Sequence, residues 1–131
     1  MPVVDTEVLF AFNPLDLKHS RAMKFLGGRA DVVAPDVAVL EFQVVLRARD
    51  RTPAQVKAAM LALHEALARC NVKEVKTLDS GLLALQCELE EKHGLSYFDS
   101  LIAAAALALD RKVVSSDRAF DRVPDLERVP L

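Results

Sequence analysis

Short apolar runs alternate with amphipathic segments along the whole chain. The first run, Val3 and Val4, is β-branched and ends at Asp5, and another, residues 8–12, continues into a turn marked by Asn13 and Pro14. Runs of β-branched residues bounded by turn residues are typical of strands. The pattern predicts strands at residues 3–4, 31–34, 113–114 and 127–129, and a strand or extended connector at residues 72–78.

Helical periodicity predicts five helices between these strands. They cover residues 16–26, 36–50, 53–68, 80–92 and 97–109, and a short helical turn follows near residue 119. A Gly-Gly pair at 27–28 ends the first helix, and a Thr-Pro-x-Gln sequence at 52–55 begins the third with a cap. The first helix is expected to turn Leu15, Ala22, Phe25 and Leu26 inward, and the third helix has an apolar stripe that suits the core or a dimer surface.

The stretch from residue 95 to residue 120 is the most informative. The run 101–109 is apolar on all sides, so it belongs in the interior or against a sheet. Asp99 stands just before this run, and Asp117 stands just after the strand at 113–114. Ser96 and Asp99 also fit a capping box, which is the plain structural explanation of that acid.

Strands that alternate with helices predict an α/β fold with right-handed crossovers and parallel strands. We expect a three-layer α/β/α sandwich with a central, mostly parallel sheet, formed by residues 1–131 as one domain. Ligands of such sheets bind beyond the carboxyl ends of the strands. Asp5 and Asp117 both follow strands at that end.

Composition narrows the class of protein. Of the 131 residues 52% are hydrophobic, which is enough for a core, and the longest apolar run is well short of the roughly 20 residues that span a bilayer. The start has no signal-peptide pattern, and Cys70 and Cys87 fit two reduced, buried thiols, so we expect a cytoplasmic protein without a membrane segment. The net charge of −2 lacks a basic nucleic-acid footprint. A polyanionic substrate would have to meet local Arg and Lys clusters or bound cations.

Glu41 is the most informative single residue. At roughly 100° per residue it points about 160° away from the polar stripe of Gln43, Arg47 and Asp50, so it faces inward. A buried carboxylate needs a cation, a hydrogen-bond network or access to water. A buried pair with an arginine is the alternative, although no basic residue lies one turn away on the same face.

Four acids can meet in this fold: Asp5 and Asp117 at strand ends, Asp99 at a helix start and Glu41 on an inner helix face. Clustered carboxylates repel one another unless a hard cation such as Mg²⁺ or Mn²⁺ binds their oxygens. Such a cation can position and acidify water for attack on a phosphodiester.

The sequence resembles the PIN domain family, in particular the single-domain VapC-type toxins of toxin–antitoxin pairs. The resemblance rests on VVDTEVLFAF, PDVAVLEFQVVLR and YFDSLIAAAALALDRKVVSSDRAFDRVP in that order, and it covers nearly the whole chain. It implies an α/β/α sandwich, Mg²⁺- or Mn²⁺-dependent ribonuclease activity on RNA, a homodimer, and neutralisation by an antitoxin protein. The metal-site acids it implies are Asp5, Glu41, Asp99 and Asp117.

The resemblance also assigns supporting residues and reveals departures. Ser115 occupies the place of a small hydroxyl residue that orients the site by hydrogen bonding, and Thr6 is a further supporting candidate. Glu7 stands where the family usually has Asn or Ser, so this extra carboxylate either joins the metal site or repels RNA. Ala119 stands where many relatives have an acid, and Asp121 is expected to be a solvated turn residue.

These observations support a metal-dependent endoribonuclease, the toxin of a type II pair. A catalytically weak or inactive PIN-like module that binds RNA or protein is the alternative, motivated by Glu7 and the acidic balance. A phosphoryl-handling domain with Asp5 as nucleophile would leave Glu41 unexplained. Six basic side chains could contact phosphate or simply be solvated: Lys18, Arg21, Lys24, Arg47, Arg49 and Arg51. His19 could touch substrate.

Overall fold

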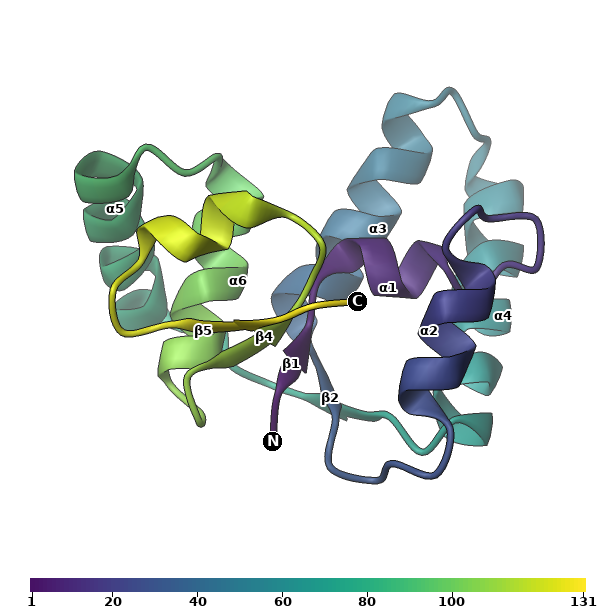
Figure 1. Ribbon diagram of the computed structural model, residues 1–131. Helices are drawn as coiled ribbons and strands as arrows, with labels where there is room; N and C mark the ends of the chain where they lie inside the picture. Colours follow the sequence, from purple (N-terminus) through teal and green to yellow (C-terminus); the bar gives the residue numbers. More distant parts are fainter.

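The computed structural model, which describes residues 1–131, is built on one sheet of five parallel strands (Figure 1). The strands are β1 (Val3–Val4), β2 (Val33–Pro35), β3 (Lys73–Val75), β4 (Lys112–Val114) and β5 (Glu127–Val129). They lie in the order β3-β2-β1-β4-β5, and every neighbouring pair is parallel. The predicted parallel sheet is therefore confirmed, with β1 at its centre.

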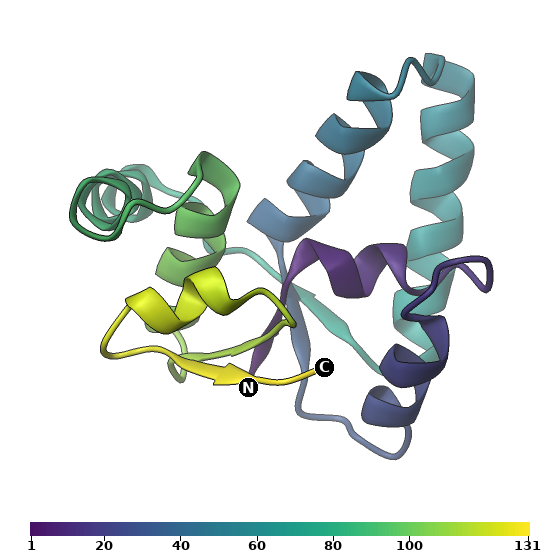
Figure 2. The same cartoon turned by 45° about the horizontal axis from the view of Figure 1, so that its top comes forward.

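Six α-helices and one 3₁₀ turn connect the strands. They are α1 (Thr6–Phe10), α2 (His19–Leu26), α3 (Asp36–Ala48), α4 (Pro53–Arg69), α5 (Ser80–His93), α6 (Tyr97–Leu107) and the 3₁₀ turn η1 (Arg118–Arg122). Figures 1 and 2 show α1 to α4 gathered on one side of the molecule and α5 and α6 on the other. The arrangement is the three-layer α/β/α sandwich that the alternating pattern predicts.

The order of the strands creates a topological switch point between β1 and β4. From β1 the chain proceeds outward through β2 to β3, and then returns across the sheet to β4 and β5. Connections leave β1 and β4 in opposite directions, and ligands of open α/β sheets bind beyond the carboxyl ends of the strands at such a point. The Asp5 N–H donates to the Val114 carbonyl across this point at 3.0 Å.

Helix α6 is the centre of the core. Ser96 caps it, and residues 101–106 are buried, as their apolar character predicts. The helix ends at Leu107, and Leu109 is exposed, so the expectation that the whole run 101–109 is buried was wrong at its end. The helix packs on α5, α3, β1 and β4. Its four consecutive alanines, 103–106, are small enough to let neighbouring backbones approach closely. The start of α6, which carries Asp99, is therefore held firmly beside the strand ends.

The structure corrects three further expectations. Residues 6–10 form the helix α1, which the apolar pattern did not predict because so short a helix shows no clear period. Helix α2 begins at His19, so Leu15 lies in the preceding turns and is 89% exposed rather than inward. Cys87 is exposed and Cys70 half-buried, so the expectation of two buried thiols was wrong.

Other expectations are confirmed. Val56, Leu63 and Leu67 of the apolar stripe on α4 are buried, so this stripe belongs to the core. None of the helices combines the length and the apolar character that spanning a bilayer requires.

The first prediction concerns α6. Replacing the fully buried Ile102 by alanine should lower the free energy of unfolding by about 2–5 kcal/mol, because it leaves a cavity in the core. Leu17, whose side chain is completely exposed, provides the control. Urea denaturation should show little change for Leu17→Ala, and an equal loss for both variants would contradict the placement of α6 in the core.

Candidate metal centre at the strand ends

Asp5 is the most deeply buried of the four candidate acids. It follows β1 directly and caps α1, and only 6% of it is exposed. One carboxylate oxygen accepts the Thr6 N–H at 2.7 Å, and the other accepts the Ser115 hydroxyl at 2.7 Å. Burial nevertheless raises the pKa of Asp5 to about 7, and the nearby charges of Glu7 and Asp99 add to this shift.

Ser115 links the ends of the two central strands. It is fully buried at the end of β4, and its hydroxyl donates to Asp5 while accepting the Asp117 N–H at 2.9 Å. Its backbone N–H donates to the Val129 carbonyl on β5 at 3.1 Å. Ser115 therefore orients the Asp5 carboxylate and holds the turn before Asp117, which is the orienting role that the resemblance implies for it.

Glu41 projects from α3 toward α1. It is half-buried, and the hydroxyl of Thr6 donates a short hydrogen bond to its Oε1. Burial is the main reason that the pKa of Glu41 is raised, and the charge of Asp99 raises it further. Glu41 forms no ion pair, so the alternative of a buried glutamate paired with an arginine is not what the structure contains.

Asp99 lies in the first turn of α6. Its backbone N–H donates to the Ser96 hydroxyl at 3.3 Å, so the predicted cap at Ser96 is present. The carboxylate is half-buried, and burial raises its pKa although the Ser96 hydroxyl and Arg122 oppose the shift. The charge of Asp117 also raises the pKa of Asp99. The helix cap therefore explains the hydrogen bond of the Asp99 backbone, but it does not explain why the pKa of the Asp99 carboxylate is raised.

Asp117 forms the exposed edge of the group. It follows β4 and caps η1, where its Oδ1 accepts the Ala119 N–H at 2.9 Å. Its backbone is held through Ser115, whereas its side chain faces solvent. Exposure thus increases from Asp5 to Asp117 across the site.

Asp99 influences the charge of two of the other acids and is influenced by the third. Its negative charge raises the pKa values of Asp5 and Glu41, and its own pKa is raised by Asp117. In the arrangement observed, no three His, Cys, Asp or Glu side chains lie close enough to hold one ion together. The donor chemistry is still that of a hard-cation site, because carboxylate oxygens that raise one another's pKa favour a bound cation.

Glu7 has a partner that the sequence did not reveal. Its carboxylate binds the Lys18 ammonium at 2.6 Å and accepts hydrogen bonds from the backbone N–H and the hydroxyl of Ser116. These contacts lower the pKa of Glu7 although burial opposes them. Lys18 lies eleven residues away across an irregular loop, so no helical or strand spacing could have indicated the pair.

The remaining basic candidates have separate places. The ring of His19 binds the Ala11 carbonyl through Nδ1 at 2.7 Å, a contact that joins α2 to the end of α1. Arg49 and Arg51 line a groove of about 460 Å³ between α1, α3 and α4. Arg122 influences Asp99, and no sequence signal singled it out. Asp121 is exposed, as expected, but it is paired with Arg128 at 3.0 Å.

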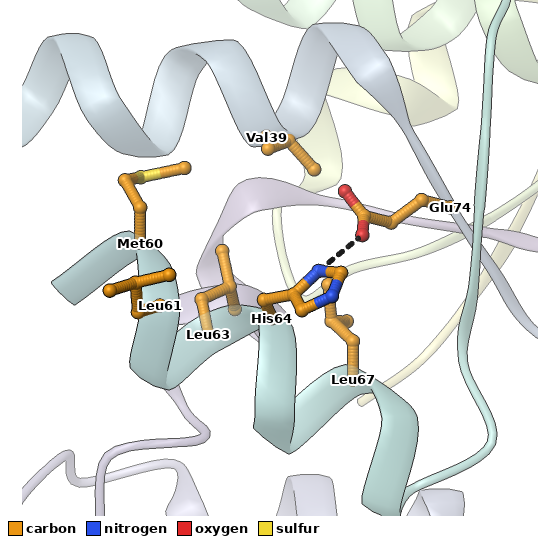
Figure 3. A pocket seen from close by; sticks show the side chains of 7 residues that line it. All are labelled: Val39, Met60, Leu61, Leu63, His64, Leu67 and Glu74. Atoms are coloured by element: carbon orange, nitrogen blue, oxygen red, sulfur yellow. Dashed lines mark hydrogen bonds and ion pairs between the residues drawn. The ribbon is translucent and has the colours of Figure 1, made fainter. Parts of the chain in front are cut away.

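The hollows of the surface lie apart from the acids. A pocket of about 350 Å³ lies between α3 and α4. Figure 3 shows His64 and Glu74 in its lining, where His64 Nδ1 lies 3.3 Å from a carboxylate oxygen of Glu74. Neither this pocket nor the groove that contains Arg49 includes any of the four acids. The candidate centre therefore lies outside both of these hollows.

Solved structures with the same fold include a toxin–antitoxin complex from Klebsiella pneumoniae, with a TM-score of 0.66 and 13% identity over 96% of this chain and 95% of that chain. VapBC2 from Rickettsia felis, bound to a DNA fragment from its promoter, matches with a TM-score of 0.70 and 18% identity over 98% of this chain and 97% of that chain. VapC20 from Mycobacterium tuberculosis, a toxin that cleaves the sarcin-ricin loop, matches with a TM-score of 0.71 and 17% identity over 92% and 93%. FitAcB from Neisseria gonorrhoeae matches with a TM-score of 0.64 and 20% identity over 98% and 96%. At these identities the likeness concerns the fold.

The family itself is established by sequence. No curated protein matches the chain significantly. The family model of the PIN domain, however, matches residues 3–126 and so includes all four candidate acids. From this match over nearly its full length, the chain belongs to the PIN domain family.

Proposed function

We propose that this PIN domain is a metal-dependent endoribonuclease that hydrolyses RNA phosphodiester bonds, and that it is the toxin of a type II toxin–antitoxin pair. One observation carries the proposal: Asp5, Glu41 and Asp99 have raised pKa values, the charge of Asp99 contributes to the shift at both of the others, and none of the three forms an ion pair. A group of this kind gains stability from a bound cation. The similarity to VapC20, which cleaves the sarcin-ricin loop, supports RNA as the substrate.

The residues fit Mg²⁺ or Mn²⁺ by their chemistry. Both ions prefer carboxylate oxygens and water, and the candidate ligands are Asp5, Glu41, Asp99 and Asp117. When bound, such an ion supplies a positioned, acidified water for attack on phosphorus and stabilises the charge that develops on the phosphate.

The other residues of the site prepare these carboxylates. The Thr6 N–H and the Ser115 hydroxyl orient Asp5, and the Thr6 hydroxyl orients Glu41. Arg122 lies near Asp99 and donates to the Gly94 carbonyl at 3.1 Å, so its guanidinium is placed beside the site as a phosphate contact. In this scheme Thr6 and Ser115 are positioning residues and Arg122 binds substrate.

The alternative, a binding module without catalysis, loses part of its motivation. It rested on the acidic balance of the chain and on Glu7 as an extra, uncompensated carboxylate. The Lys18 ammonium matches this charge, so Glu7 adds little net repulsion toward RNA. The cleavage experiment below separates the two functions.

An antitoxin is the proposed partner, by analogy with the toxin–antitoxin complexes of similar fold. The groove between α1, α3 and α4 suits it. Apolar residues such as Phe10, Phe42 and Leu46 line this groove, and three arginines border it: Arg49, Arg51 and Arg69. None of the three forms an ion pair within the chain, so the groove complements an apolar helix that carries acidic side chains.

A homodimer and a cytoplasmic location stay predictions. Sedimentation of the purified chain tests whether it forms a homodimer.

The second prediction concerns catalysis. Asp99→Asn should reduce cleavage of a labelled, structured RNA by about 100-fold or more in Mg²⁺ or Mn²⁺, because it removes a ligand charge at the centre of the acid group. EDTA should abolish wild-type cleavage. Asp125→Asn, an equal change of charge at an exposed residue, should cleave normally.

The outcomes of this experiment are distinct. Equal activity of the wild type and Asp99→Asn would assign the cleavage to a contaminant. Inactive wild type that also fails to bind Mn²⁺ in calorimetry at millimolar concentration would overturn the enzyme proposal. Metal binding without cleavage of any RNA tested would favour the binding module.

The third prediction uses the raised pKa of Asp5. Because its pKa is about 7 in the folded protein and 3.8 without the fold, the folded state binds the extra proton between these values. The stability that Asp5 contributes through this proton is therefore fully present below pH 3.8 and is lost as the pH rises through 7. Asp5→Asn should raise the free energy of unfolding at pH 8 in EDTA by about 1–3 kcal/mol, and the gain should shrink at pH 4.

Thermal melts at the two pH values provide the measurement. Added Mn²⁺ should reduce the difference at pH 8, because a cation stabilises the wild-type carboxylate and not the amide. The exposed Asp125→Asn is again the matched control. A melting temperature for Asp5→Asn that is unchanged or lower at pH 8 in EDTA contradicts clustering of the acids.

The fourth prediction tests the groove. Coexpression with the product of a neighbouring open reading frame should yield a stable complex, and Arg69→Glu should weaken it because the change reverses a charge beside the groove. The same reversal at the exposed Lys57 of α4, which is not among the groove residues, should leave the complex intact. Equal binding by both variants would exclude the groove as the antitoxin surface.

A further inference from the structure

Glu7, Lys18 and Ser116 form a closed network at the margin of the acid group. Lys18 Nζ donates to Glu7 Oε2 at 2.6 Å and to Ser116 Oγ at 3.0 Å, and Ser116 Oγ donates to Glu7 Oε2 at 2.8 Å. The backbone N–H of Ser116 donates to the other oxygen, Oε1. Only 18% of the Glu7 side chain and 33% of the Lys18 side chain are exposed. Both oxygens of Glu7 are therefore occupied by donors from two distant segments.

The network acts on the turn that carries Asp117. Ser115 is attached to Asp5, and Ser116 is attached to Glu7. Ser115 is also held by its backbone, whose N–H donates to the Val129 carbonyl, so the contacts of Ser116 with Glu7 add an attachment one residue closer to Asp117. Asp5 and Glu7 belong to one rigid piece, since Asp5 caps the helix in which Glu7 lies. The pair of attachments therefore sets the direction of Asp117 relative to Asp5.

Lys18 supplies the charge that keeps Glu7 in this position. It is the only ion-pair partner of Glu7, and its own backbone N–H is held by Asp16 Oδ1 at 2.8 Å. Without this ammonium, Glu7 would be a half-buried anion two residues from Asp5, whose pKa it already raises. Such an anion turns toward any cation held by the neighbouring acids. Lys18 thus keeps Glu7 attached to Ser116 and away from the ligand set.

We propose that Glu7 and Lys18 are a positioning pair, which fixes the turn 115–117 and keeps the Glu7 carboxylate out of the metal-binding group. The resemblance leads us to expect a neutral side chain at position 7, and the pair stands in its place. Because the net charge of the pair is zero, the charge of the site is preserved. The role of Asp117 in this scheme rests on the proposed ribonuclease function. The fixing of the turn is a property of the chain itself.

Three variants and a control test the pair. Lys18→Met removes the ammonium, Glu7→Gln keeps an oxygen that accepts from the Ser116 N–H without a charge, and the double variant combines both. Lys24→Met, at an exposed lysine of α2 without an ion pair, is the control for lost charge. Hydrogen exchange of the Ser116 and Asp117 amides is measured by NMR in the protein without added metal. Mn²⁺ affinity and the rates of RNA cleavage are measured on the same samples.

We expect Lys18→Met to speed exchange of the Ser116 amide about tenfold or more, while Lys24→Met leaves it unchanged. The double variant should regain most of the protection, because a neutral acceptor then faces Ser116. Lys18→Met should also bind Mn²⁺ several-fold more tightly yet lower kcat with little change in KM, since the released Glu7 joins the ligands. A purely structural ion pair would instead weaken metal binding and not be rescued by the second substitution.

The proposed positioning role of the pair is wrong if the Ser116 amide exchanges at the wild-type rate in Lys18→Met. It is also wrong if the double variant protects this amide no better than Lys18→Met does. These readouts need neither RNA nor metal. If the wild type neither binds Mn²⁺ nor cleaves RNA, the proposed function fails, and the exchange data alone still decide whether Glu7 and Lys18 fix the turn. If Mn²⁺ binds and Lys18→Met weakens rather than strengthens it, the exclusion of Glu7 from the ligand set is wrong.

Discussion

The burial of one carboxylate at the end of the central strand is the constraint around which the site is arranged. Asp5 follows β1 at the point where the connections of β1 and β4 diverge. Its two hydrogen bonds come from adjacent elements, the first turn of α1 and the end of β4. They orient the carboxylate without neutralising it, and its pKa stays raised. A chain selected for stability alone would place an apolar or amide side chain here, so the acid indicates a function.

Charge compensation around the site is selective. Two acids at the margin have cationic partners: Glu7 is paired with Lys18, and Asp121 is paired with Arg128. The inner acids have hydroxyl or backbone donors and no ion pair; these are Asp5, Glu41 and Asp99. Hydrogen bonds of this kind fix geometry at little change in net charge. The arrangement separates the task of holding the acids in place from the task of balancing their charge.

Much of the fold follows from local patterns. The cap of α4 was predicted from four residues, and both of its reciprocal hydrogen bonds are present between Thr52 and Gln55. The apolar run of α6 predicted its burial, and the angular position of Glu41 predicted that its side chain turns inward. Each of these inferences depends on neighbours within one or two turns. Such neighbours are fixed by helix geometry, whatever the tertiary structure.

What the sequence did not predict depends on distant contacts. Leu15 fits a helical stripe by type, yet α2 begins only at His19, and turns before it expose the side chain. The pairing of Glu7 with Lys18 closes across a loop whose path no periodicity describes. Whether the four acids act together is likewise a question of tertiary geometry. The sequence located their strand ends and helix faces, and the electrostatic influence of Asp99 on its neighbours required the structure.

The gradient of exposure across the acids bears on the kind of substrate. Asp5 is buried, Glu41 and Asp99 are half-buried, and Asp117 faces solvent. Neither the pocket between α3 and α4 nor the groove that contains Arg49 includes these acids, and Asp117 is open to solvent. A small metabolite is usually held in a concave pocket that covers most of its surface. A polymer needs only one phosphodiester at the acids while its remaining length lies on the surface outside. The exposure of Asp117 is therefore consistent with the proposed RNA substrate.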